Sequence, residues 1–180
     1  MELILIDGGP ASGKNTLGEL LIKEFKKFGK KAVLLDLDTF VEKYNPKWIW
    51  NNENQKELDL LNARIDYSKE IDKLLCEGHS VIAIGERFLS LKDTKKFISR
   101  LKTKCVVQLY HLKVPFFLRE KRLHERGPHS LIDLKKDQND RDLVKKWPGF
   151  VYENTSTPEV DSANLMILIQ KKKGLLKIKF

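Results

Sequence analysis

The chain has 180 residues, of which 41% are hydrophobic and 33% charged, so residues 1–180 can bury one core as a single domain without disulfides or structural metals. Its longest apolar runs are far shorter than the roughly 20 residues that cross a bilayer. The start, MELILIDGG, lacks the length and basic flank of a signal peptide, so we expect a cytoplasmic protein with no membrane contact. The net charge of +9 favours polyanionic ligands; its lysine clusters fit either a solvated face or a track for nucleic acid.

Short apolar runs alternate with longer amphipathic segments, which is the pattern of βαβ units around a parallel sheet. Five strands are predicted, at Glu2–Asp7, Lys31–Asp36, Ser80–Gly85, Cys105–His111 and Phe150–Glu153. Helices are predicted at Lys14–Phe28, Glu57–Glu77, Leu91–Leu101, Pro115–Arg126, Leu131–Lys146 and Pro158–Gln170. Because right-handed crossovers bring the loops after the strands to one edge of the sheet, we expect ligand-binding residues to meet there.

The loop after the first strand reads GGPASGKNT and carries the strongest signal in the chain. The spacing of Gly8, Gly13 and Lys14 lets backbone N–H groups form a nest for phosphate, and the following helix presents its positive end to the same anion. Lys14 is expected to reach the β and γ phosphates of ATP. The residues predicted to bind the nucleotide here are Gly8, Gly9, Ala11, Ser12, Gly13, Lys14, Asn15 and Thr16.

One position of this loop departs from the usual pattern. Asn15 stands where a magnesium-binding Ser or Thr usually follows the lysine, and Thr16 comes one residue later. Mg²⁺ keeps several of its waters readily, so we expect it to be held largely through water by Thr16, Asp36 and Glu86.

The second strand leads into DLDTFVEKYNP, which places Asp36 at the strand end and Asp38 two residues later. A carboxylate at this edge can orient an acceptor hydroxyl and take its proton, so Asp38 is predicted as the catalytic base, with both aspartates at the substrate. Capping of a helix beginning at Thr39, or water-mediated magnesium binding, are the alternatives, and Asp36 suits them better.

The third strand leads into GERF, where Glu86 is predicted to contact magnesium through water or to bind the acceptor. Arg87 is predicted to hold the acceptor or the transferred phosphate. A salt bridge at the strand end is the alternative for both residues.

The fourth strand leads into VPFFLREKRLHERG, in which Arg119, Arg122 and Arg126 share one side of a helix. Arg119 is expected to pair with a surface carboxylate. Beyond the segment containing GPHS, Arg141 is predicted either to approach the substrate as a further cation or to form a helix-surface ion pair. Near the C-terminus, Thr155 precedes a helix start marked by proline, and capping of that helix is sufficient to explain the residues there.

Three remaining features carry weaker expectations. Trp48 and Trp50 are expected to pack the helix onto the sheet or to stack on an acceptor ring. Cys76 and Cys105 lie far apart in apolar surroundings, which predicts small core residues rather than a disulfide or metal pair. The histidines have no metal-binding spacing and are expected at the surface or at strand ends; they are His79, His111, His124 and His129.

In chain order, GGPASGKNT, DLDTFVEKYNP, SVIAIGERFL, REKRLHERG and YENTSTPEVDSANLMI resemble P-loop kinases of the nucleoside-monophosphate-kinase-like group, especially chloramphenicol phosphotransferase and shikimate kinase. The resemblance covers nearly the whole chain, and the P-loop is its specific motif. It implies a three-layer α/β P-loop NTPase fold with a five-stranded parallel sheet in the order 2-3-1-4-5. It also implies ATP and Mg²⁺, an acceptor-binding insert at about 40–62 and a small lid at about 127–140.

The same resemblance implies residue roles. Asp38 matches the catalytic carboxylate, and Arg122 and Arg126 match the arginines that compensate the charge of the transferred phosphate. Thr16 matches a threonine that meets the α-phosphate, and the loop at Thr155 matches one that passes over the adenine.

The sequence leaves three functions open. The first is transfer of the ATP γ-phosphate to a hydroxyl of a small molecule or to a nucleotide; GERF in place of DGxPR argues against adenylate kinase itself. The second is a kinase acting on nucleic-acid 5′ ends. The third is a nucleotide-dependent binding module without phosphotransfer, and the missing NKxD motif argues against a GTPase. The active form is expected to be a monomer or homodimer.

Overall fold

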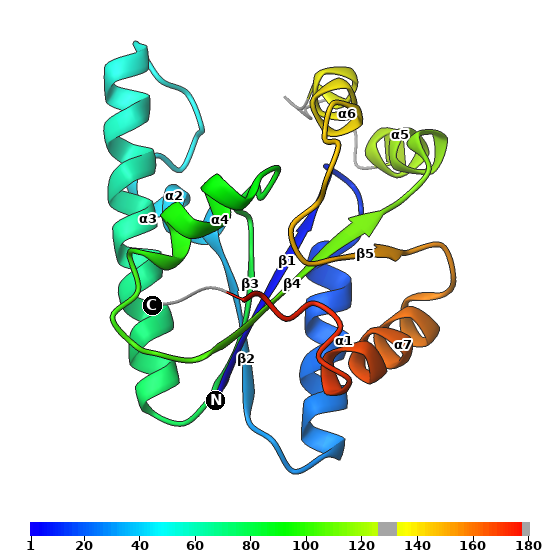
Figure 1. The fold of residues 1–180 in the computed structure, drawn as a ribbon. Coiled ribbons are helices and arrows are strands. Elements are labelled where there is room, and N and C mark those ends of the chain that lie inside the picture. The colour runs from blue at the N-terminus through cyan, green and yellow to red at the C-terminus, as the bar shows by residue number, and fades with distance from the viewer. Residues whose placement is uncertain (126–132, 178–180) are drawn as a thin grey trace.

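The structure is a computed structural model that describes residues 1–125 and 133–177. Five parallel strands form a sheet in the order β2-β3-β1-β4-β5, which confirms the predicted fold class and strand order (Figure 1). The strands are β1 (Glu2–Gly8), β2 (Ala32–Asp36), β3 (Ser80–Ile84), β4 (Val106–Lys113) and β5 (Phe150–Glu153). In the central strand, Leu3 lies beside Val81 of β3 and Val107 of β4.

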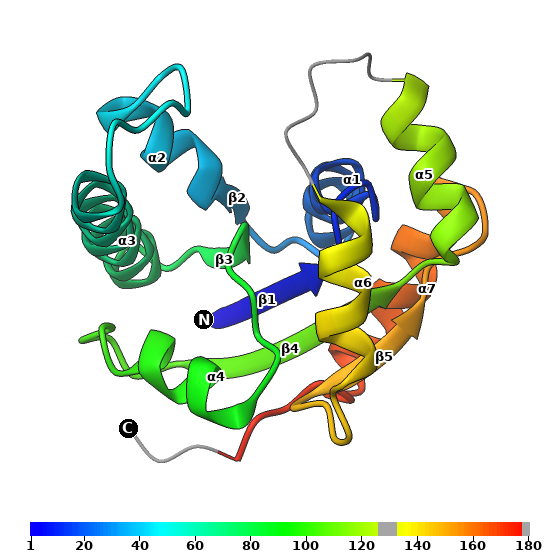
Figure 2. The same ribbon diagram turned by 90° about the horizontal axis from the view of Figure 1, so that it is seen from above.

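Helices cover both faces of the sheet, which gives three layers (Figure 1). One face is covered by α1 (Lys14–Lys27) and α7 (Pro158–Gln170). The other face is covered by α2 (Leu37–Tyr44), α3 (Glu53–Cys76) and α4 (Leu91–Ile98). The remaining helices, α5 (Phe116–Glu125) and α6 (Leu134–Asp142), stand over the carboxyl ends of the strands, as the view from above shows (Figure 2).

The spacing of apolar residues explains this packing. Leu17, Leu21 and Phe25 recur every four residues on α1, so they share one stripe, and all three are buried. This stripe packs against the sheet and against Leu165 and Ile169 of α7. Truncation of a leucine at such a position to alanine costs about 2–5 kcal/mol of stability.

Several elements differ from the sequence prediction. The segment after β2 is the helix α2, which was predicted only as one alternative: Asp36 caps it by accepting a hydrogen bond from the Asp38 amide at 3.1 Å. The long helix α3 begins at Glu53 rather than Glu57, because Asn52 accepts from the Gln55 amide and caps it. The helix α6 is shorter than predicted, beginning after its cap Asp133 and ending at Asp142.

The structure also corrects several burial predictions. Cys76 is exposed at the end of α3, where it faces Thr103 at 3.4 Å, whereas Cys105 is half-buried and burial raises its pKa to about 11; both are free thiols. His111 lies near the end of β4, which is one of the two places expected for the histidines, and it is buried there; His129 lies outside the described residues. The tryptophans pack as expected, with the Trp48 and Trp50 rings edge to face at 5.9 Å against the core.

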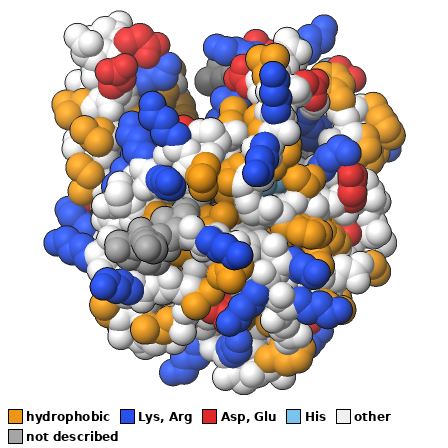
Figure 3. Space-filling model, viewed as in Figure 1, with side chains coloured by type: hydrophobic (Ala, Val, Ile, Leu, Met, Phe, Trp, Pro, Cys, Tyr) orange, Lys and Arg blue, Asp and Glu red, His pale blue; other side chains and the backbone are white. Residues whose placement is uncertain are grey.

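The C-terminal segment adds an unpredicted pairing. The Leu109 amide donates to Gly174 at 2.9 Å and the Leu176 amide donates to Val107 at 3.0 Å, so residues 174–176 run antiparallel to the first half of β4. Of the helices that the structure describes, none has the length and apolar character needed to cross a membrane. Lysine and arginine side chains are spread over the face in Figure 3 rather than gathered into one stripe.

Candidate active site

The phosphate-binding loop leaves the N-terminus of α1 without a side-chain cap among the described residues. Gly13, the residue before α1, has φ of +86°, a left-handed conformation that favours glycine, and Ala11 has φ of +58°. The first amides of the helix therefore point out of the loop with the positive end of the helix dipole behind them, which is the arrangement that binds an anion.

Two polar groups in this loop fit a bound phosphate. The Ser12 hydroxyl is buried and, in the part of the chain that the structure describes, has no hydrogen-bond partner; a Cβ at Gly8 would collide with it. Nζ of Lys14 donates to the carbonyls of Gly8 at 2.8 Å and Gly9 at 3.2 Å. Burial lowers the pKa of Lys14, while Asp7 acts in the opposite direction. Phosphate oxygens would supply acceptors to these donors, so the residues present fit a nucleotide.

Asn15, the residue that departs from the usual motif, is hydrogen-bonded to the end of the second strand. Nδ2 of Asn15 donates to Oδ2 of Asp36 at 2.7 Å, which ties the phosphate loop to the end of β2. Thr16 is exposed one residue further along α1. The described residues contain no cluster of three or more carboxylate, histidine or cysteine side chains able to hold a metal by themselves. Phosphate oxygens and water would have to complete any magnesium site here.

Asp38 lies in the first turn of α2 and is reached by solvent. Its pKa is raised to about 6, first because partial burial desolvates it and then because Asp36 is close, while Lys14 acts in the opposite direction. A carboxylate with this pKa is largely ionised at pH 7 and can still accept a proton effectively.

A cavity of about 300 Å³ lies on the other side of the loop. It is bounded by the start of α1, the end of α5 and the loop after β5, with Arg122 and Asn154 in its wall. Nδ2 of Asn154 donates to the Ser12 carbonyl at 2.8 Å and Nη1 of Arg122 donates to the Ala11 carbonyl at 3.3 Å. Thr155 is exposed next to this wall. Asn154 was not predicted, since an Asn before a helix cap reads as part of the turn.

Asp7 is the main residue that the sequence prediction missed. Its buried carboxylate accepts hydrogen bonds from the Gly8 amide at 2.7 Å, from Nδ1 of His111 at 3.0 Å and from Nη1 and Nη2 of Arg141 at 3.2 and 3.0 Å. A longer bond of 3.4 Å comes from the Phe88 amide. Burial alone would raise the pKa of Asp7, but His111 and Arg141 hold it well below its usual range. An aspartate at the end of a buried strand was the available signal.

A second buried carboxylate continues this network. Asp137 of α6 accepts from Nη1 of Arg119 at 3.1 Å and from Nε of Arg141 at 3.0 Å. The prediction that Arg119 pairs with a surface carboxylate is wrong, because both Arg119 and Asp137 are buried. Arg141 is likewise not confined to a helix-surface pair, since it bridges Asp137 to Asp7 at the base of the phosphate loop.

Glu86 and Arg87 lie beyond the end of β3. Oε1 of Glu86 accepts from Nε of Arg64 at 2.9 Å and from Nη1 of Arg100 at 3.4 Å. Nη2 of Arg87 lies 3.2 Å from Asp140 and 3.3 Å from Asp137. Both predicted residues therefore take part in ion pairs at the strand end. Arg126 and residues 127–132 of the predicted lid lie outside the described residues, and the rest of that range begins α6.

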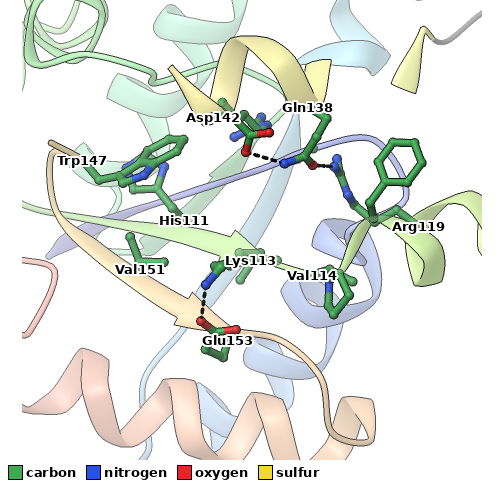
Figure 4. A pocket seen from close by; sticks show the side chains of 14 residues that line it. His111, Lys113, Val114, Arg119, Gln138, Asp142, Trp147, Val151 and Glu153 are labelled. Carbon is green, nitrogen blue, oxygen red and sulfur yellow. Dashed lines mark hydrogen bonds and ion pairs between the residues drawn. The ribbon is translucent and has the colours of Figure 1, made fainter. Parts of the chain in front are cut away.

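A cavity of about 350 Å³ lies between α5, α6 and strands β4 and β5 (Figure 4). Its back wall carries His111 and Trp147, whose rings are 4.5 Å apart, and Lys113 pairs with Glu153 at its side. Gly9 and Arg141 reach this cavity, but Lys14, Asp36 and Asp38 do not line it. The candidate reaction site is therefore beside Lys14 and Asp38 rather than in this cavity.

The comparisons with known proteins agree with this geometry at the level of fold. A sugar kinase from Janibacter sp. HTCC2649 has a TM-score of 0.66 and 14% identity, covering 94% of this chain and 95% of that one. Shikimate kinase from Aquifex aeolicus has a TM-score of 0.60 and 18% identity, covering 95% and 97%. APS kinase from Mycobacterium tuberculosis, in complex with AMPPNP and APS, has a TM-score of 0.60 and 11% identity, covering 94% and 97%.

The chain has the P-loop kinase fold. The predicted resemblance is thus confirmed for the fold, although identities below 20% leave activity and substrate to be argued from the site. No protein-family model matches the chain, and no curated protein matches it in sequence.

Proposed function

We propose that this P-loop kinase fold carries a phosphotransferase that moves the γ-phosphate of ATP to a hydroxyl of a small molecule, or to a nucleotide. The observation that carries the proposal is the pair formed by Lys14 and Asp38. Each lies near enough to shift the other's pKa, one on the phosphate loop and the other on α2. A cation for the γ-phosphate and a carboxylate with a pKa of about 6 for the acceptor are the two charges that such a transfer needs.

In this proposal the acceptor hydroxyl gives its proton to Asp38 as its oxygen attacks the γ-phosphorus. The bond from that phosphorus to the oxygen bridging the β and γ phosphates breaks, and ADP leaves with the electron pair. Lys14 stabilises the negative charge that spreads over the transferred group. Arg122, and Arg126 beyond the described residues, would add further positive charge.

Nucleotide binding falls to the open loop. The backbone amides of Gly8, Gly9, Ala11, Ser12, Gly13, Asn15 and Thr16, with the hydroxyls of Ser12 and Thr16, would surround the phosphates. The base would occupy the cavity beside Arg122 and Asn154, close to Thr155. When bound, Mg²⁺ would neutralise the phosphate charge, and Thr16, Asp36 and Glu86 would face it through water.

Acceptor binding falls to the side of the sheet where β2 and β3 end. Asp36, Asp38, Glu86 and Arg87 follow these two strands, and the segment 40–62 continues from α2 into α3. Arg141 would act on this side indirectly, since its guanidinium is held by Asp7 and Asp137.

The test is turnover of ATP with Mg²⁺ against a panel of labelled acceptors. The panel contains nucleosides, nucleotides, sugars, sugar acids, small aromatic alcohols and short 5′-hydroxyl RNA and DNA. Transfer of label to a small molecule, lost in Lys14→Ala, would support the proposal. Transfer to oligonucleotides alone would replace it with a kinase of nucleic-acid ends, which the charge of +9 would suit. ATP binding without transfer to any acceptor would favour a binding module.

A further inference from the structure

A strongly basic pocket lies behind the turn that follows β3. Its volume is about 300 Å³, and it is bounded by α3, by residues 85–88 and by α4. These helices lie on the same face of the sheet (Figures 1 and 2). Its charged lining residues are Arg64, Glu86, Arg87, Asp93, Lys96 and Arg100. Four cations thus face two carboxylates, and the pocket carries an excess of positive charge.

Glu86 holds two of these cations in place. Nε of Arg64 and Nη1 of Arg100 come from different elements and converge on the same oxygen of Glu86. The Glu86 side chain is 12% exposed, so it is well placed to bring two mutually repelling guanidinium groups together. Only one nitrogen of each guanidinium is used, and within the described residues the Nη atoms of Arg64 have no hydrogen-bond partner.

The other charges do not cancel the excess. The Asp93 carboxylate accepts a hydrogen bond at 2.7 Å from the hydroxyl of Ser90, the residue that caps α4. Lys96 is exposed on α4, and no ion pair forms between it and the carboxylates that the structure describes. Arg87 directs Nη2 to Asp137 and Asp140 and is 48% exposed, so its other nitrogens remain accessible.

The pocket adjoins the candidate reaction site. Gly85, in its wall, stands against the cap of α2: a Cβ at this position would lie 2.9 Å from Oδ1 of Asp36. Asp36 in turn accepts from Asn15 of the phosphate loop, and Asp38 is two residues further along. The pocket therefore lies on the same side of the phosphate loop as Asp36 and Asp38, with Gly85 between them.

We propose that this pocket binds an anionic group of the phosphate acceptor, so that the substrate is a hydroxyl compound carrying a carboxylate, sulfate or phosphate. Planar guanidinium groups bind such oxyanions through two parallel hydrogen bonds. Glu86 holds the guanidinium groups of Arg64 and Arg100 in place, and their remaining N–H groups are available to the ligand. Lys96 adds a further charge at the mouth. The proposal rests on the phosphotransferase function and narrows its substrate class.

The first experiment compares matched acceptors. Sugar acids and sugar phosphates are each tested beside the corresponding neutral sugar, with ATP and Mg²⁺. We expect transfer to one charged class, with KM at least tenfold below that of its neutral partner. The identity of this class shows whether the pocket recognises a carboxylate or a phosphate.

Arg64→Gln, Arg100→Gln and Lys96→Gln should raise the acceptor KM, the arginine variants by about 10- to 100-fold, with the KM for ATP unchanged. Lys95→Gln is the control, since this exposed neighbour on α4 does not line the pocket. Equal use of neutral acceptors would overturn the proposal.

The second experiment does not depend on transfer. With ADP and Mg²⁺ saturating the phosphate loop, sulfate is titrated and the melting temperature is followed. The sulfate-dependent rise should persist in Lys95→Gln and shrink in Lys96→Gln and in the Arg64→Gln/Arg100→Gln double variant. An identical rise in all of these proteins would exclude an anion site here even if the protein is a kinase. If the sulfate-dependent rise in melting temperature disappears in the arginine double variant and no acceptor is phosphorylated, the anion site is supported and the proposed function is not. Lys96 lies on the surface of α4, so its variant remains informative if the arginine variants do not fold.

Discussion

Two aspartates flank the phosphate loop in opposite surroundings. Asp7 is buried at the end of β1, and its carboxylate is held by a histidine, an arginine and the Gly8 amide, which keep its pKa well below the usual range. Asp38 is accessible to solvent on α2, and partial desolvation with the nearby Asp36 raises its pKa to about 6. Of these two aspartates, Asp7 is thus fixed as an anion on one side of Lys14, whereas Asp38 on the other side can exchange a proton near neutral pH.

The wider surroundings follow the same division. On the side of β4, the carboxylates Asp7 and Asp137 are buried among Arg119 and Arg141, and the charges are largely satisfied within the protein. On the side of β2 and β3, Asp38 and Arg87 are accessible. We infer that the first side positions the loop and α6, whereas the second performs the chemistry. The predictions below test this division.

The largest effect is expected at Lys14, which both sides share. Lys14→Ala removes the ammonium group from the loop, and with it the charge that stabilises the transferred phosphate. We expect kcat to fall by about 10³-fold or more, measured as ADP formation with the best acceptor of the panel. Circular dichroism and thermal unfolding should match the parent protein. A variant that keeps more than a tenth of the activity would show that Lys14 does not meet the γ-phosphate.

Asp38→Asn should separate chemistry from binding. The amide keeps the shape but cannot accept the proton, so we expect kcat to fall by about 10²-fold or more, with the Kd of ADP within twofold of the parent value. Full activity in this variant would remove Asp38 from the role of base.

The pH profile gives an independent check on Asp38. Because the base must be ionised and its pKa is about 6, kcat/KM of the parent protein should fall tenfold per pH unit on the acid side of about pH 6. This limb should be absent in Asp38→Asn. A limb that persists unchanged in the variant would assign the titration to another group.

Asp7→Asn should act on stability. The substitution leaves Arg141 without its buried counter-charge, so we expect the free energy of unfolding at pH 7 to fall by about 3 kcal/mol, measured by urea denaturation. The pKa of Asp7 is lower in the folded than in the unfolded chain, so its contribution is complete above about pH 4 and is lost as the pH falls further. The deficit of the variant should therefore shrink between pH 4 and pH 2.

Asp66→Asn is the matched control for this measurement. Asp66 makes exposed bonds to Tyr44 and Lys69, so its loss should cost much less. A deficit in Asp7→Asn that stays constant with pH would mean that the changed hydrogen bonding of the side chain, rather than its charge, is responsible.

The strands and the phosphate loop could be predicted because their signals are local, whereas the order of the strands in the sheet was implied by the resemblance to P-loop kinases. A buried run such as Leu3–Ile6 followed by GGPASGKNT specifies a strand, a turn and the start of a helix within fourteen residues. The helix α2 was harder to predict, since it has only eight residues and its cap, Asp36, also reads as a strand end. The roles assigned to Asp38, Glu86 and Arg122 remain predictions.

The buried network could not be predicted, because its partners are brought together only by the fold. Asp7 and Arg141 are 134 residues apart in sequence and Asp7 and His111 are 104 apart. Nothing near Arg119 or Arg141 in the sequence distinguishes a buried arginine from a surface one. A charged residue on a helix is predicted to be exposed unless the sequence also shows which oppositely charged residue pairs with it in the core.

The smallest effect is expected at Asn154, on the far wall from Asp38. Its amide donates to the Ser12 carbonyl and bounds the cavity proposed for the base. Asn154→Ala removes one buried hydrogen bond, worth about 1 kcal/mol, so the Kd of ADP should rise about fivefold, measured by calorimetry, while kcat at saturating ATP stays close to the parent value. Asn139→Ala, an exposed amide on α6 outside that cavity, should change neither quantity. An unchanged Kd in Asn154→Ala would move the base out of this cavity. A fall in kcat without a change in Kd would instead assign the far wall to the chemical step and break the division between the two sides of the loop.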